Sequence, residues 1–123
     1  MVSRSTTTDR LKMLTKICLS LPGTTRQDKG GHAAFLVGRR IFAYYLNHHH
    51  GDGIVGLSCK VLAGDNVKLV EASPRKFYMP AYVGPRGWVG LRLDRASVDW
   101  NEVTELTYCS YVQIAPKRLQ KLL

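Results

Sequence analysis

The order of the hydrophobic periodicities constrains the fold of this chain more than any other feature. Apolar residues recur at intervals of three and four from Leu11 to Leu21 and again from Trp100 to Tyr111, which is the spacing of amphipathic helices. Between these segments lie short β-type runs separated by glycine-rich turns. Because helices flank the series of strands, the pattern predicts an α+β fold instead of a doubly wound sheet.

The N-terminal segment predicts a tail, a helix and a loop. Residues 1–8 are polar and without periodicity, so we expect a flexible tail ahead of a single domain at 9–123. Pro22 and Gly23 end the first helix, because proline cannot continue the hydrogen-bond ladder. The polar segment 24–31 that follows is predicted to be a loop.

A small antiparallel sheet is predicted next. The runs 33–37 and 41–46 flank Gly38, which can adopt the positive φ of a tight hairpin turn, so these two runs should pair antiparallel. A third strand is predicted over 54–59, after a connection rich in breaker residues.

The C-terminal half predicts two helices and one further strand. A short helix is expected over 65–72 and a strand over 87–93. Asp99 followed by Glu102 has the spacing of a capping box at the start of the last long helix, and Pro116 ends it. The predicted order is therefore α-β-β-β-α-β-α, a small antiparallel sheet with flanking helices.

Net charge is the unusual property of the composition. Lys and Arg number 18 against 9 Asp and Glu, which gives +9 at pH 7. Such a surplus attracts polyanions such as DNA, although it also serves solubility through self-repulsion. No apolar run approaches the ~20 residues that cross a bilayer, and no secretion signal is recognisable. We therefore expect a cytoplasmic protein with no membrane partner. The sequence does not determine the oligomeric state, for which a monomer is favoured.

The cysteines do not suggest a disulfide framework or a catalytic thiol. Cys18, Cys59 and Cys109 are odd in number and form no CxxC pair, so we expect reduced thiols packed as small hydrophobes. A nucleophilic cysteine would need a base held beside it, and nothing in the sequence supplies one. The chain also lacks a P-loop and a dinucleotide-binding glycine pattern. The sequence thus predicts no enzyme, no catalytic residue and no cofactor.

The histidine run is the obvious metal candidate. His48, His49 and His50 stand close to Asp52, but adjacent side chains in extended chain point in alternate directions and cannot all converge on one ion. We expect a solvated polar loop and no metal site.

Basic and aromatic residues alternate between Arg75 and Arg95. Cations that meet phosphates, interleaved with rings that stack on bases, are typical of a single-strand binding platform. In the other interpretation, Phe77 and Trp88 belong to the core and the charges form a solvated rim. The residues concerned are Arg75, Lys76, Phe77, Tyr78, Tyr82, Arg86, Trp88, Arg92 and Arg95.

A series of short motifs resembles the MmcQ/YjbR family over about residues 9–120. Each motif is weak alone, but their order is fairly specific. They are Leu21-Pro22-Gly23-Thr24, Phe35-Leu36-Val37-Gly38, Ser58-Cys59-Lys60, Pro80-Ala81-Tyr82-Val83-Gly84, Arg86-Gly87-Trp88-Val89 and Ala115-Pro116-Lys117-Arg118-Leu119. Two features depart from the family pattern: the histidine run at 48–50, and Gly64-Asp65-Asn66 at the start of the middle helix.

The resemblance implies a fold likened to that of the frataxin homologue CyaY, without an established enzymatic activity. It also implies a DNA-binding surface called a double wing. The positions that match the family motifs are Lys60, Tyr82, Arg86, Trp88, Lys117 and Arg118.

Two hypotheses follow. In the first, the chain is a non-enzymatic nucleic-acid-binding domain whose cations contact phosphates while Tyr82 and Trp88 pack against sugar or base. Because Arg86 and Trp88 are two residues apart in or beside a strand, we expect them to share one surface, with Trp88 partly exposed. The alternative is a protein-interaction or small-anion-binding module that uses a cleft between sheet and helices.

Overall fold

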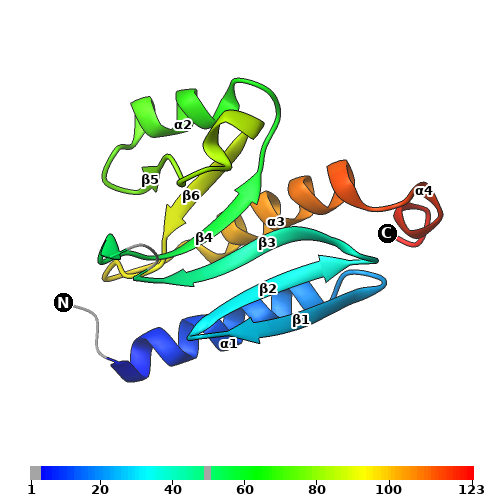
Figure 1. Cartoon of the computed structure of the whole chain (residues 1–123), viewed down its shortest axis with the longest axis horizontal. Coiled ribbons are helices and arrows are strands. Elements are labelled where there is room, and N and C mark those ends of the chain that lie inside the picture. Colours follow the sequence, from blue (N-terminus) through cyan, green and yellow to red (C-terminus); the bar gives the residue numbers. More distant parts are fainter. Residues whose placement is uncertain (1–3, 49–50) are drawn as a thin grey trace.

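The computed structural model describes residues 4–48 and 51–123 (Figure 1). Helices occupy both ends of the chain and strands occupy most of its middle. In chain order the elements are α1 (Arg4–Leu19), β1 (Thr24–Lys29), β2 (His32–Val37), β3 (Arg40–Asn47), β4 (Val55–Lys60), α2 (Asp65–Ala72), β5 (Phe77–Tyr78), the 3-10 turn η2 (Gly84–Arg86), β6 (Trp88–Arg92), α3 (Trp100–Ile114) and α4 (Lys117–Gln120).

The strands form one six-stranded sheet in the order β1-β2-β3-β4-β6-β5, and every neighbouring pair is antiparallel. The predicted α+β fold is confirmed. The hairpin of β2 and β3 turns at Gly38, whose φ of 62° is in the left-handed region as expected. The short helix expected over 65–72 is α2. Asp99 caps α3, and its Oδ1 accepts hydrogen bonds from the backbone N–H groups of Asn101 and Glu102.

Two sequence predictions near the N-terminus were wrong. The segment 24–31, expected as a loop, contains β1, which pairs with β2 from Thr24↔Val37 to Lys29↔His32. An edge strand obtains its hydrogen bonds from one neighbour and can leave its side chains in water, so it needs no apolar alternation. Helix α1 begins at Arg4, inside the segment expected as a tail, because backbone hydrogen bonding continues upstream of the amphipathic part.

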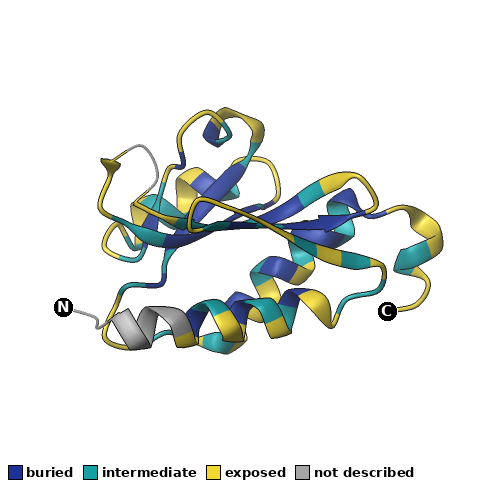
Figure 2. Cartoon of the chain, turned by 60° about the horizontal axis from the view of Figure 1, so that its bottom comes forward, coloured by how far each residue is buried: buried dark blue, intermediate teal, exposed yellow. Residues whose placement is uncertain are grey.

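Helices α1 and α3 lie behind the sheet in Figure 1 and cover one of its faces. Figure 2 shows the buried residues concentrated in the sheet and on the helix sides that face it. Phe42 of β3 meets Tyr111 of α3 edge to face, with ring centroids 5.6 Å apart. The Ser110 hydroxyl donates to the Phe42 carbonyl at 2.5 Å and accepts from the Lys60 N–H at 3.0 Å. One side chain of α3 therefore bridges β3 and β4 by hydrogen bonds.

The opposite face of the sheet is covered only in part. Helix α2 contacts β5 and β6 there. The buried Asn66 of α2 donates through its amide nitrogen to the carbonyls of Gly84 and Trp88, at 2.9 and 3.1 Å. These bonds hold the segment 79–87 against α2 and leave the rest of this face open for a cavity.

Candidate functional site

The antiparallel topology gathers cations at one end of the sheet. The β2–β3 turn carries Arg39 and Arg40, both exposed. Because β4 runs antiparallel to β3, its last residue, Lys60, lies at the same end, opposite Trp88 at the start of β6. Arg86 stands two residues before that start and is exposed.

The C-terminal helices reach the same end. The Gln113 side chain of α3 donates to the Lys60 carbonyl at 3.1 Å, and Leu119 of α4 packs beside Gly23, where a Cβ atom would lie 2.8 Å from the Leu119 Cδ1. We call the cations of these segments the basic end. They are Arg39, Arg40, Lys60, Arg86, Lys117, Arg118 and Lys121.

The cations of the basic end form no ion pair with any residue that the structure describes. The ion pairs found between described residues are Arg26–Asp28, Lys76–Glu102 and Arg92–Asp94, and none of them involves a cation of the basic end. Lys60 is half-buried and its companions are exposed. The structure thus brings together four of the residues expected from the family motifs: Lys60, Arg86, Lys117 and Arg118.

Lys60 and Arg86 line one depression of 810 Å³, between the start of α2, the η2 turn and the end of α3. Gly64, Gly87 and Gln113 contribute to its lining. The position of α2 is fixed by the Asn66 amide described above. An anion in this depression would meet two cations and a side-chain amide.

Trp88 is not a surface residue. It is 8% exposed and packs against Tyr44, with ring centroids 5.8 Å apart. The expectation that Arg86 and Trp88 share a surface was wrong, because Arg86 belongs to the η2 turn and Gly87, at φ 90°, redirects the chain before β6 begins. Lys76 lies 5.1 Å above the buried Phe77 ring, which is the cation–π contact recorded among the described residues. Core packing explains both Phe77 and Trp88.

Tyr82 is 81% exposed and has a φ of 67°, a left-handed conformation that is uncommon for a residue with a side chain. It does not face the depression of Lys60 and Arg86. It lines a second cavity, on the other side of the segment 79–87.

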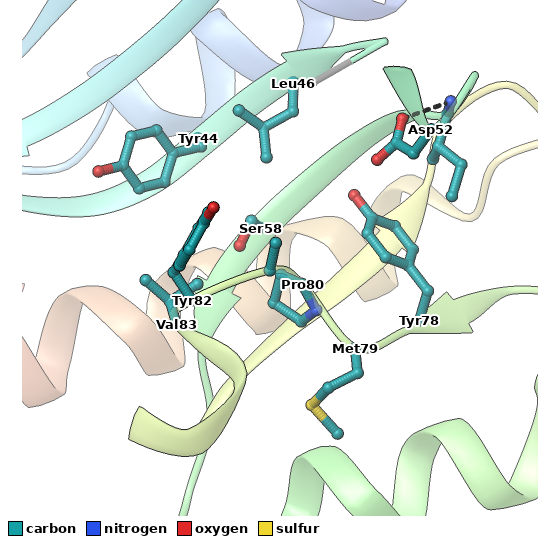
Figure 3. A pocket seen from close by; sticks show the side chains of 11 residues that line it. Tyr44, Leu46, Asp52, Ser58, Tyr78, Met79, Pro80, Tyr82 and Val83 are labelled. Atoms are coloured by element: carbon teal, nitrogen blue, oxygen red, sulfur yellow. Dashed lines mark hydrogen bonds between the residues drawn. The ribbon is translucent and has the colours of Figure 1, made fainter. Parts of the chain in front are cut away.

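This second cavity has a volume of 570 Å³ and opens on the sheet face opposite α1 and α3. Tyr44, Ser58, Gly90 and Tyr78 are directly opposite one another in neighbouring strands, so they share this face. Figure 3 shows Tyr44 and Tyr82 on one side of the cavity and Tyr78 on the other, with Ser58 and Pro80 between them.

Two strand glycines make room for the Tyr78 ring. A Cβ atom at Gly90 would lie 2.3 Å from the ring, and one at Gly56 would lie 2.4 Å from its hydroxyl. Burial raises the pKa of Tyr78 to about 12, and the negative charges of Asp52 and Asp94 add to the shift, so the hydroxyl is neutral at physiological pH. Sequence analysis missed this cavity. Its one signal was glycine inside strands, which marks close approach of another group.

The cysteines and histidines have structural roles where they are described. Burial raises the pKa of Cys59 to about 12 and that of Cys18 further, so both are neutral packed thiols as predicted. The Nδ1 atom of His48 accepts a hydrogen bond from the Gly53 N–H at 2.9 Å. His49 and His50 lie outside the described residues. Within the described part of the chain, no three His, Cys, Asp or Glu side chains are grouped as metal ligands would be.

Comparisons with known proteins identify the family. The YjbR family model matches residues 19–113. The chain belongs to the YjbR family. Among solved structures, it is similar to the Deinococcus radiodurans protein DR2400, a DUF419 domain, with a TM-score of 0.70 and 23% identity over 91% of this chain and 86% of the other. That likeness supports the YjbR fold. A search of curated proteins found no match.

Among the helices of residues 4–48 and 51–123, none combines the length and apolarity that a bilayer-spanning segment requires.

Proposed function

We propose that this YjbR domain binds nucleic acid through its basic end, without catalysis of its own. The observation that carries the proposal is the convergence of unpaired cations from separate segments on one end of the sheet. Exposed, unpaired Lys and Arg side chains are the groups that neutralise phosphates and release counterions. DNA is the expected partner, in agreement with the double-wing surface that the family resemblance implies.

The proposed contacts divide into two groups. Lys117 and Arg118 project from α4 and would meet backbone phosphates as exposed charges. Lys60 and Arg86 would hold one phosphate more closely, because they line the same depression. Trp88 has no part in the proposal, since it is buried. Tyr82 is exposed but lies on the other side of the segment 79–87 from the depression of Lys60 and Arg86, so it would reach a sugar or base only at the edge of the contact.

Salt dependence tests the proposal directly. Affinity should fall linearly with salt on a log–log plot, with a slope of about −0.9 for each phosphate neutralised on duplex and about −0.7 on single strand. Fluorescence anisotropy with labelled mixed-sequence duplex and single strand, over a range of salt concentrations, gives both slopes. A chain that binds neither form at low salt does not have this function.

A small-anion-binding function is the alternative, and the shared depression of Lys60 and Arg86 favours it. Calorimetry with inorganic phosphate distinguishes the two. Saturable phosphate binding that Arg86→Ala abolishes, together with no affinity for nucleic acid, would replace the first proposal by the second.

A further inference from the structure

We propose that the 570 Å³ cavity on the open sheet face is a binding site for a small organic cation with an aromatic or apolar body. This site is separate from the basic end and would take a ligand of opposite charge to nucleic acid. Its volume lies within the range of small-molecule sites.

The cavity is formed in advance by the fold. Tyr78 is held over Gly56 and Gly90, because its ring occupies the space that their side chains would fill. Pro80 is buried and contributes a rigid part of the lining. A wall that is fixed before the ligand arrives lowers the ordering cost of binding.

Ser58 supplies a buried polar group for which the described residues offer no hydrogen-bond partner. It is 0% exposed, and among the described residues its hydroxyl is the buried side-chain atom for which no hydrogen-bond partner is found. Burying a hydroxyl without a partner is costly, so such groups in native proteins call for an explanation. Ser58 lines the cavity between the tyrosines in Figure 3, where a ligand donor or acceptor would complete its bonding.

The charge of the lining selects the ligand class. Of the described residues around the cavity, Asp52 is the charged one, although the whole chain carries +9. One of its carboxylate oxygens accepts from the Ile54 N–H at 2.8 Å, which fixes the side chain at the cavity. Tyr44, Tyr78 and Tyr82 add aromatic rings, whose faces attract cations. An anion would find no cationic partner among the described residues of this lining.

The backbone of Tyr82 is a further sign of a functional position. Its left-handed φ of 67° costs energy for a residue with a side chain, and strained residues concentrate at binding sites. The strain holds an aromatic ring at the cavity mouth, where it can cover a bound ligand.

Three probes of similar shape and different charge test the proposal: 2-phenylethylamine, 2-phenylethanol and 3-phenylpropanoate. We expect the amine to bind tightest, with a Kd on the order of 1 mM, and the carboxylate to bind weakest. Amide NMR shifts should move at Ser58 and Gly90. Carboxylate binding as tight as amine binding, or shifts confined to other parts of the chain, would overturn the proposal.

Two variants assign the roles within the site. Asp52→Asn keeps an acceptor for the Ile54 N–H and removes the charge, so amine affinity should fall about three- to fivefold while affinity for the alcohol stays unchanged. Ser58→Ala should lower amine affinity about three- to tenfold and raise Tm, because the unpaired hydroxyl is gone. An unaltered amine affinity in both variants would refute the site. Neither variant should change nucleic-acid affinity, so this test and that of the basic end fail independently.

Discussion

The two ends of the sheet differ in whether their charged side chains form ion pairs. At the basic end, cations from the β2–β3 turn, the end of β4, the η2 turn and α4 accumulate without ion pairs among the described residues. At the opposite end the chain places most of its carboxylates, close to cations. They are Asp28 at the end of β1, Asp52 before β4, Asp94 after β6, and Asp99 and Glu102 at the start of α3.

The opposite end, which we call the paired end, contains ion pairs between described residues, which the basic end does not. Arg92 donates to both carboxylate oxygens of Asp94, at 3.0 and 2.9 Å. Burial opposes ionisation of Asp94, but the hydrogen bonds and charge of Arg92, together with backbone hydrogen bonds, outweigh it and lower the pKa of the carboxyl. Arg26 lowers the pKa of Asp28 mainly by a hydrogen bond. Three ion pairs neutralise part of the charge at this end, whereas no cation of the basic end is in an ion pair with a described residue.

The largest effect should be on the unfolding free energy, and it should distinguish the buried Trp88 from the exposed Arg86 nearby. Trp88→Ala should cost about 3–5 kcal/mol of unfolding free energy, because it empties a packed position. Arg86→Ala, two residues away, should change stability by less than about 0.5 kcal/mol. Chemical denaturation measures both, and Trp88→Phe, which keeps a ring, should fall between them. Equal losses for Trp88→Ala and Arg86→Ala would mean that Arg86 is structural.

The next largest effect should be on nucleic-acid affinity, and it should distinguish the two ends of the sheet. The double variant Lys117→Ala, Arg118→Ala should lose two phosphate contacts, which reduces the magnitude of the salt slope by about 1.8 and duplex affinity by about 60-fold at about 0.1 M salt. The matched control is Lys29→Ala, Arg95→Ala, which removes the same charge from exposed positions at the other end. Equal losses in the two variants would show that binding depends on net charge alone.

The smallest effect should be a loss of stability at the paired end as the pH falls. A carboxyl whose folded pKa is lowered adds stability above its unfolded pKa of about 3.9, and that stability is lost as pH falls through the folded pKa. Asp94→Asn should therefore cost about 0.5 kcal/mol at pH 7 and nothing in strong acid. Thermal melts from pH 7 to pH 2 follow the difference. A gap between variant and parent that persists in strong acid would assign Asp94 a role other than its charge.

Much of the fold was predictable because its signals are local. The Gly38 turn, the α2 segment and the Asp99 cap each depend on residues a few positions apart, and each was confirmed. β1 was missed, since an exposed edge strand acquires its hydrogen bonds from β2 and shows no periodicity of its own.

The candidate sites show the same contrast between local sequence signals and contacts that form only in the folded chain. The basic surplus, the family motifs and the four cations that the structure brings to one end are all evident from the sequence alone. Tertiary structure alone decided that Trp88 is buried, because Gly87 turns the chain between it and Arg86. It also decided the cavity of Ser58, whose walls come from segments far apart in the chain. The spacing of nearby residues predicts turns, caps and helical periodicity. Burial and the clustering of charges depend instead on which strands become neighbours in the sheet.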